Sequence, residues 1–333
     1  MANIQKKLFW QKPIVVSKIK FDIFAAMIKQ KPAISIYLYA FFAMLFWGFS
    51  FVWTKIVLDY LDPISIIFFR LIVSSFLLYG FITFFRRKQP IHRRDLKWFF
   101  LSALFEPFLY FIGENYGVKF STATISSVMI ALMPVLTPLA AFVFLREKIG
   151  VLNVIGIFVS FYGVLLMVTG NGFSLSTDPR GLIFLGVAVL AGLFSSVLMG
   201  RLSRTYSSLT IITYQNIIGA IYFFPVFMIM EVDSIQNIDF TGELIFSMIM
   251  LAIFASSLAF IFYVNAIRGL GISRTNIFTN LIPIITAVVS YFYLDEQFTL
   301  NKILGMAIVI AGVFMAQIKL KHIKGIWRKS PKS

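Results

Sequence analysis

Long apolar runs dominate this sequence and limit what the chain can fold into. A helix needs about 20 mostly apolar residues to cross a bilayer core of roughly 30 Å, and ten runs approach that length. The runs are continuously apolar, whereas the strands of a membrane barrel would alternate apolar and polar residues. We therefore expect an all-α polytopic membrane protein with ten transmembrane helices, at residues 36–57, 63–85, 97–117, 122–145, 151–169, 181–201, 209–230, 244–267, 272–294 and 302–318.

The composition excludes several other classes of protein. Of 333 residues, 59% are hydrophobic and 13% charged, too few polar residues to cover a soluble multi-domain enzyme. The chain has no Cys, which excludes disulfides, thiolate catalysis and Cys-based metal sites. Its two His, His92 and His322, lie among Lys and Arg outside the apolar runs, so we expect no metal and no cofactor. The net charge is +16, but the Lys and Arg residues that produce it cluster between the apolar runs, as they do in membrane proteins. Nucleic acid is therefore not an expected partner.

The positions of Lys and Arg predict the orientation in the membrane. If both termini are cytoplasmic, 25 of the 30 Lys and Arg residues lie inside and only three lie in outer loops. This bias indicates cytoplasmic termini. The basic tail at 1–35 could form a short interfacial helix or remain disordered, and the basic tail at 319–333 is expected to be solvated.

The sequence contains an internal duplication, with one repeat at 36–169 and a second at 181–318. Four residue pairs recur at one separation of 149: Pro134 with Pro283, Glu147 with Glu296, Gly156 with Gly305, and Gly163 with Gly312. A shift of 145 aligns Ser50 with Ser195 and Arg70 with Gln215. Each repeat holds five helices, an odd number, so the second repeat should be inverted. Inverted repeats are typical of alternating-access transporters, although channels can also be built from them.

The same residues resemble a known family. The run Trp47-Gly48-Phe49-Ser50-Phe51 followed by Lys55, then Pro63 with Arg70, and the Pro to Leu-x-Glu to Gly to Gly pattern of both repeats resemble the EamA-type members of the drug/metabolite transporter superfamily. The resemblance covers about 36–318. It implies a central cavity between the repeats, export of small metabolites or amphipathic solutes without ATP hydrolysis, and a bacterial cytoplasmic (plasma) membrane. The family pattern offers no counterpart for the carboxylates in the third helix.

Glu106 lies near the middle of the third apolar run, where a charged side chain costs about 2.5–3.5 kcal/mol on insertion scales. Pro107 follows it and should loosen the helix, freeing a carbonyl that a wet cavity could satisfy. Because an apolar environment favours a neutral carboxyl group, we predict that Glu106 takes up and releases a coupling proton. The alternative is a permanently protonated Glu that hydrogen-bonds a neighbouring helix.

Other polar residues inside the runs are candidates for solute binding. Arg70 and Glu114 have comparable depth and should form a pair, whereas Lys55 should extend toward the outer surface. The second repeat supplies neutral amides and hydroxyls at the corresponding positions. A charged wall facing a neutral polar wall suits a zwitterionic or polar organic solute. The predicted binding residues are Trp47, Ser50, Arg70, Tyr110, Glu114, Asn115, Gln215, Tyr263, Asn276 and Asn280.

The leading hypothesis is a secondary transporter that is not an enzyme. The alternative is a polytopic membrane enzyme in which Glu106 and Glu114 act as acid and base on a lipid-linked substrate. A gated channel or receptor is a third class, but the chain lacks a soluble sensor domain. The glycines at 156, 163, 305 and 312 should permit close helix contact, which leaves a homodimer possible.

Overall fold

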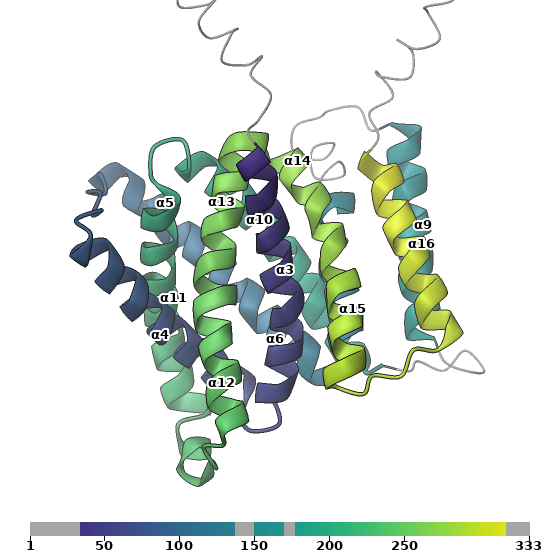
Figure 1. Cartoon of the computed structure of the whole chain (residues 1–333), viewed down its shortest axis with the longest axis horizontal. Helices are drawn as coiled ribbons and strands as arrows, with labels where there is room; N and C mark the ends of the chain where they lie inside the picture. The colour runs from purple at the N-terminus through teal and green to yellow at the C-terminus, as the bar shows by residue number, and fades with distance from the viewer. Residues whose placement is uncertain (1–33, 137–149, 170–176, 318–333) are drawn as a thin grey trace, which may run out of the picture.

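The computed structural model describes residues 34–136, 150–169 and 177–317, and regular structure there is helical (Figure 1). In these ranges, eight helical segments are long and apolar enough to cross a membrane, and two shorter apolar helices span Ala123–Leu136 and Leu300–Ala316. The expected all-α polytopic fold is confirmed, with ten as an approximate count of spans. The basic tails and Glu147 lie outside the described residues.

The helices before residue 170 follow the expected runs closely. α4 begins at Pro63, a residue suited to the first turn of a helix because its missing N–H would have no partner there. α7 begins after Thr122, whose side chain accepts a hydrogen bond from the Ile125 N–H. The elements are α3 (Ile34–Val57), α4 (Pro63–Phe84), η1 (Arg93–Asp95), α5 (Leu96–Ala103), η2 (Leu104–Leu109), α6 (Tyr110–Phe120), α7 (Ala123–Ile130) and α9 (Val151–Val168).

The helices after residue 176 depart from expectation in the ninth run. The run at 272–294 is not a single α-helix, because a tight 3₁₀ segment, η6 (Asn276–Asn280), separates α14 (Ile272–Thr275) from α15 (Leu281–Tyr293). A change of helix type in mid-span often marks a hinge or a functional site. The other elements are α10 (Pro179–Leu202), α11 (Ser208–Met230), η4 (Asp233–Asn237), α12 (Gly242–Met250), η5 (Leu251–Leu258), α13 (Ala259–Leu270) and α16 (Leu300–Gln317).

The third span of each half is interrupted at a similar place. The backbone widens into π-helical turns at η2 in the first half and η5 in the second. In η2, Glu106 has φ −148° and ψ 116°, values outside the helical region, and Pro107 follows it. The expected loosening of the helix at Pro107 is therefore present. Such wide turns leave backbone groups without their usual partners, so side chains from neighbouring helices must supply them.

Helices of the two halves run in opposite directions. Lys55 at the end of α3 bonds the last carbonyls of α6, so α3 and α6 are parallel. α10 begins where α6 ends, with Gly181 against Phe120, and α13 ends where α3 begins, with Gly269 against Ile36. The first helices α3 and α10 are therefore antiparallel, as inverted repeats require. We call the end of the bundle where α3 begins (top of Figure 1) the near face and the opposite end the far face.

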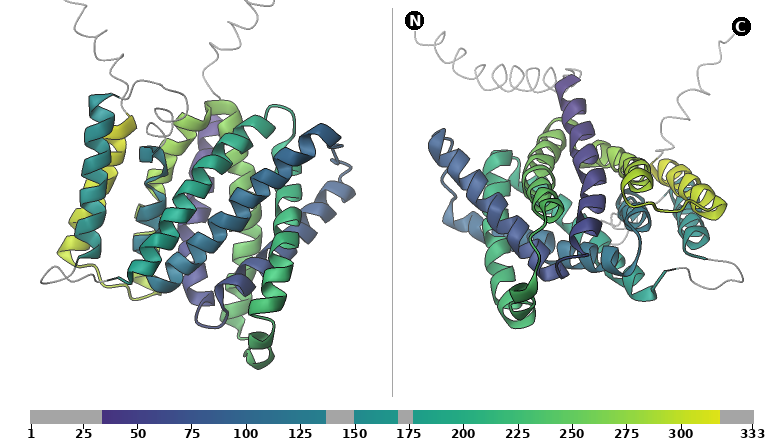
Figure 2. Two further views of the ribbon diagram at one scale, coloured as in Figure 1. Left: turned by 180° about the vertical axis from the view of Figure 1, so that it is seen from behind. Right: turned by 60° about the horizontal axis from the view of Figure 1, so that its bottom comes forward.

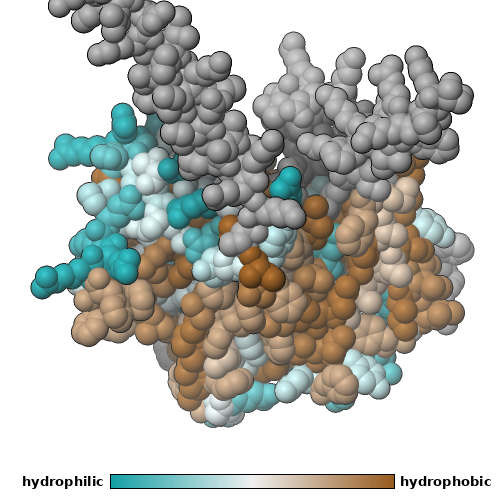
Figure 3. All heavy atoms as spheres, turned by 45° about the horizontal axis from the view of Figure 1, so that its top comes forward, coloured by the Kyte–Doolittle hydropathy of each residue, from teal (hydrophilic) through white to brown (hydrophobic). Residues whose placement is uncertain are grey.

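An apolar belt surrounds the bundle. Large hydrophobic side chains point outward from most spans, including Phe76, Phe158, Ile183 and Ile229. Figure 3 shows hydrophobic side chains covering the flank, with hydrophilic residues gathered toward its upper left and lower margins. This distribution is the reverse of a soluble protein and fits a lipid-facing surface.

The recurring glycines join α9 to α16 within one chain. These two helices stand together at one edge of the bundle (Figure 2). Cβ atoms built on Gly163 and Gly312 would lie 2.7 Å from Gly305 O and 2.6 Å from Ser160 N. Only glycine allows such a close backbone approach, so this small-residue face is occupied by an internal contact.

Gly163→Ala should destabilise the fold, because the new methyl group meets backbone atoms that cannot move aside. We expect a loss of about 1–3 kcal/mol, measured by unfolding in mixed detergent micelles. Gly186→Ala on α10 is the matched control, since a Cβ there has no atom within 4 Å. Equal stability of the two variants would contradict the close α9–α16 contact.

Candidate functional site

A small enclosed cavity lies at the centre of the bundle. Its volume is about 30 Å³, enough for one or two water molecules. Residues from both halves line it, among them two carboxylates and four aromatic rings. The lining comprises Trp47, Phe51, Glu106, Tyr110, Glu114, Ile130, Met133, Gly192, Ser196, Tyr263, Thr279 and Ile282.

A larger hollow of about 360 Å³ lies between α4 and α11, but it is not the polar site. It is an open apolar groove, and Ser75 is the one polar residue among the described residues that line it. Neighbouring Ile72, Ile221 and Phe224 are exposed in the apolar belt. This groove offers no charged side chain among its described lining residues, whereas the central cavity is lined by two carboxylates.

Glu106 is held in the cavity wall by two helices of the other half. The Ser195 hydroxyl on α10 donates to Glu106 Oε2 at 2.5 Å. On α11, the Gln215 amide donates to the Glu106 backbone oxygen at 2.5 Å and to Ser102 Oγ at 3.1 Å. Glu106 is 8% exposed, and within the described ranges no Lys or Arg forms an ion pair with it. The Glu106 carboxyl group therefore has a hydroxyl partner but, in the described part of the chain, no ion-pair partner within 4.0 Å.

Arg70 and Glu114 form the expected buried pair. Arg70 Nη1 lies 4.0 Å from Glu114 Oε2, and the guanidinium stands 4.0 Å above the centre of the Phe111 ring. Tyr110 donates to the other carboxylate oxygen, Oε1, at 3.3 Å. Glu114 faces the cavity, whereas Arg70, at 2% exposure, is not among the lining residues. Arg70 thus supports Glu114 from behind.

A polar network extends from Arg70 to the wide turn of the second half. Arg70 Nε donates to Ser256 Oγ at 2.7 Å, and Ser74 shares a 2.6 Å hydrogen bond with Ser257. Asn216 donates to Ser74 Oγ and to the Ser256 carbonyl. α4 therefore supports η5, just as Gln215 on α11 supports η2. The second span of each half thus bonds the interrupted backbone of the other half, and Asn216 adds a bond from within the second half.

The neutral wall of the cavity centres on Tyr263. Its hydroxyl donates to Asn276 Oδ1 at 2.8 Å and shares a 3.1 Å hydrogen bond with Ser196. The Tyr263 ring also lies 5.0 Å from the Trp47 ring, centre to centre. Asn280 is 3% exposed, and its amide oxygen and nitrogen have no partner. This wall is therefore built from η6, α10 and α13.

The expected binding residues separate into two groups. Trp47, Tyr110, Glu114 and Tyr263 line the cavity, together with the candidate proton carrier Glu106. The others lie behind the lining. Ser50 donates to the Trp47 carbonyl and Asn115 to the Phe111 carbonyl, while Arg70, Gln215, Asn276 and Asn280 occupy the positions described above.

Several lining residues lay outside the set predicted from sequence: Ile130, Met133, Gly192, Ser196, Thr279 and Ile282. The partner of Glu106, Ser195, was also missed as a site residue. The internal repeat could have indicated Ser195, because Ser195 aligns with Ser50, which was one of the predicted binding residues. Apolar residues such as Ile130 carry no comparable signal in a chain that is 59% hydrophobic.

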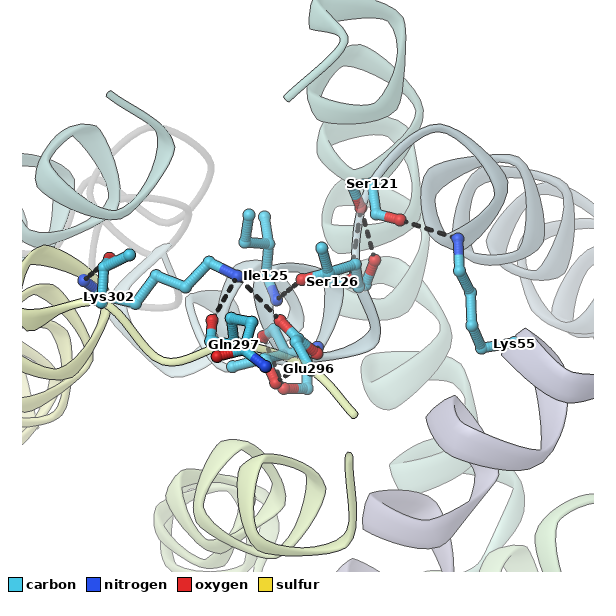
Figure 4. Close-up of polar contacts among 11 residues, drawn as sticks. Lys55, Ser121, Ile125, Ser126, Glu296, Gln297 and Lys302 are labelled. Carbon is cyan, nitrogen blue, oxygen red and sulfur yellow. Dashed lines mark hydrogen bonds and ion pairs between the residues drawn. The ribbon is translucent and has the colours of Figure 1, made fainter. Parts of the chain in front are cut away.

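Polar contacts close the bundle at its far face (Figure 4). Lys55 Nζ donates to the Val118 and Ser121 carbonyls at 3.1 and 3.0 Å, which differs from the expected extension toward water. Glu296, from the second half, accepts from the Thr124 hydroxyl at 2.9 Å and from Lys302 at 3.3 Å. Of these contacts, the Thr124–Glu296 hydrogen bond joins the two halves.

Arg268 makes a related closure at the near face. Its Nε and Nη2 donate to the Ser203 and Tyr206 carbonyls at 3.1 and 2.5 Å. Arg268 thus joins the ends of α13 and α10, as Lys55 joins the ends of α3 and α6. Since α10 and α13 correspond to α3 and α6, a cation bonded to helix-end carbonyls closes the same junction in each half.

Arg70→Met should be strongly destabilising, because it leaves the buried Glu114 without its counter-charge. We expect a loss of about 3 kcal/mol in the free energy of unfolding. The double variant Arg70→Met/Glu114→Gln should lose less than the sum of the two single variants. Lys119→Met, which breaks the exposed 2.5 Å pair with Asp62, should cost under about 1 kcal/mol. Additive losses would contradict the pairing.

Comparison with known proteins gives a consistent result. The model of the EamA-like transporter family matches residues 34–169 and again residues 179–317. An uncharacterized transporter of Archaeoglobus fulgidus is 25% identical over 81% of this chain and 94% of its own. The uncharacterized transporter YvbV of Bacillus subtilis is 26% identical over 89% and 96%. A solved crystal structure shares the fold, with TM-score 0.64 and 14% identity over 85% of this chain and 98% of its own. The chain belongs to the EamA-like transporter family and is a multi-pass membrane transporter.

Proposed function

We propose that this protein is a secondary transporter that moves a small organic solute by alternating access and couples the movement to protons. The observation that carries the proposal is Glu106, a buried acid without a counter-charge in the wall of a closed central cavity. The cavity holds about 30 Å³, less than an organic solute needs. Solute therefore enters only when one face of the bundle opens.

Proton coupling follows from the surroundings of Glu106. A charged carboxylate in a low-dielectric interior is costly unless a cation accompanies it. Ser195 can donate to a carboxylate or accept from a carboxylic acid, so it tolerates both protonation states. In the closed cavity, a proton bound to Glu106 neutralises the charge of its carboxylate. Glu106 releases this proton when solute arrives.

The contact between the halves at the far face supports alternating access. Opening the far face requires breaking the Thr124–Glu296 contact, which joins the halves there. The wide turns η2 and η5 offer places where the third spans can bend, because the helix is already interrupted at these points. Small-residue packing keeps α9 and α16 together as a unit during such a movement.

The charges at the two faces support a cytoplasmic near face, and the family resemblance favours export. At the far face, Lys119, Arg180 and Lys302 each pair with an acid. In the described part of the chain, the near-face cations, including Arg87, Arg94, Arg204 and Arg274, form no ion pair within 4.0 Å. The unbalanced positive charge belongs on the cytoplasmic side of a bacterial plasma membrane.

A membrane enzyme is the competing proposal, because Glu106 and Glu114 line the same cavity, as an acid and a base would. The relatives favour transport, since those compared above are named transporters. Chemical turnover of a lipid-linked substrate by the purified protein would favour the enzyme, whereas recovery of unmodified solute inside vesicles favours the transporter.

Glu106→Gln should abolish flux driven by a pH gradient in proteoliposomes, because the amide keeps the shape of the side chain but cannot exchange a proton. We expect at least about a 10²-fold loss of flux, in the range of a lost proton-transfer group. Glu243→Gln, which alters an exposed acid bonded to Tyr60, is the control and should retain flux. Unchanged flux in Glu106→Gln would rule out the coupling role.

A reversible cross-link at the far face should stop transport. The chain has no Cys, so Thr124→Cys/Glu296→Cys introduces a unique thiol pair. A short bifunctional thiol reagent should join the two residues, hold the far face closed and block flux, and a reducing agent should restore it. Thr124→Cys alone, treated identically, should remain active. Full flux in the completely cross-linked protein would contradict an opening at this face.

A further inference from the structure

We propose that the central cavity selects an organic monocation, a substituted or quaternary ammonium group carrying apolar substituents. This inference rests on the proposed transport function and names the substrate class of the same site. It is narrower than the zwitterionic or polar organic solute that the residue types suggested, because Arg70 lies behind the cavity lining and not in it.

The charges that face the cavity have one sign. Glu106 and Glu114 line it, and among the described lining residues none is Lys, Arg or His. The nearest buried cation, Arg70, lies behind Glu114, where it bonds Ser256 and stacks on Phe111. Arg70 can offset the charge of one carboxylate. With both carboxyl groups ionised, one negative charge remains, and Glu106 is the carboxylate without an ion-pair partner within 4.0 Å among the described residues.

The uncompensated charge at Glu106 can be balanced in two ways. Either a proton binds the carboxyl group, or a positively charged solute occupies the cavity beside it. Ser195 is its hydroxyl partner and carries no charge. Since one carboxylate cannot be protonated and paired with a cation at the same time, the two ligands compete. Competition at one acid is sufficient to exchange one proton for one monovalent cation.

The aromatic lining favours an organic cation over a hydrated metal ion. Trp47, Phe51, Tyr110 and Tyr263 face the same space as the two carboxylates. Aromatic faces attract ammonium groups through their quadrupoles, most strongly when water is excluded. Metal ions instead prefer several oxygen, nitrogen or sulfur ligands, and the described residues contain no cluster of three His, Cys, Asp or Glu.

Two of the rings are held in position before any solute binds. The Tyr110 hydroxyl bonds Glu114, and the Tyr263 hydroxyl bonds Asn276 and Ser196. The Trp47 ring packs 5.0 Å from both Tyr263 and Phe260. Aromatic side chains that are already held in place lose little conformational entropy when a solute binds. The affinity of these rings for an ammonium group is therefore higher.

The test compares three probes of similar size that differ in charge: benzyltrimethylammonium, phenylalanine and benzenesulfonate. Binding to the purified full-length protein is measured by isothermal titration calorimetry in two buffers of different ionisation enthalpy. We expect benzyltrimethylammonium to bind at least about tenfold more tightly than either other probe and to release about one proton. Tighter binding of phenylalanine or benzenesulfonate would overturn the inference.

Two substitutions with matched controls locate the binding site. Glu106→Gln should weaken benzyltrimethylammonium binding by at least about tenfold and remove the released proton, whereas Glu243→Gln should leave both unchanged. Trp47→Leu should weaken binding by about tenfold through the lost ring, whereas Trp53→Leu, on the same helix but outside the cavity lining, should not. Full affinity in Glu106→Gln would overturn the inference even if Trp47→Leu binds weakly.

A flux experiment separates this inference from the proposed function. In proteoliposomes with a pH gradient, movement of labelled benzyltrimethylammonium supports both. Movement of labelled phenylalanine that benzyltrimethylammonium does not inhibit would overturn the cation inference and retain the transporter. Tight cation binding without movement of any probe would support the cation site and overturn the transport proposal.

Discussion

The structure depends on the cost of leaving a charge unpaired at membrane depth. Arg70 meets this constraint with three partners on two other elements: Glu114 and Phe111 on α6, and Ser256 on η5, whose carbonyl Ser74 and Asn216 also bond. These contacts fix the rotation of α4, bring the interrupted span of the second half against the first, and turn Glu114 toward the cavity. Arg70 is therefore a structural anchor, and because it lies behind Glu114 the described lining of the cavity contains two carboxylates and no cation.

The inverted repeat gives this arrangement its form. In each half the third span is interrupted, and the second span of the other half bonds it there. Gln215 donates to the Glu106 carbonyl at η2, whereas at η5 Ser74 donates to the Ser256 carbonyl and Arg70 to the Ser256 hydroxyl. Interrupted backbone inside a bilayer is tolerated only where protein or water satisfies it. The reciprocal repair binds the halves together near the cavity. The two aligned side chains differ in charge, since Arg70 is a cation and Gln215 is neutral. The surroundings of the cavity are therefore charged on one side and neutral on the other.

Sequence reasoning reached the spans, the break at Pro107 and the Arg70–Glu114 pair, because each follows from a cost that depends on residue type and depth. It was less successful with residues whose role depends on which way the side chain points. Ser50, Asn115 and Gln215 were expected in the cavity and instead bond backbone carbonyls. Asn276 was expected to face the cavity from a regular helix, but it lies in a 3₁₀ segment and bonds Tyr263. The glycines of α9 and α16 were open to a role between two chains, and they pack against each other within one chain.

There is a physical reason why some features can be read from the sequence and others only from the tertiary structure. Length and hydropathy decide that a run crosses the membrane, the odd number of helices per repeat decides that the halves are inverted, and the number of residues from a helix end decides how deep Glu106 lies. All of these can be read along the chain. Rotation about each helix axis cannot, because spans that are apolar on every side have no polar stripe to indicate which face turns inward. Packing alone decides that Glu106 meets Ser195, that Arg70 lies behind Glu114, and that four aromatic rings enclose the same small space.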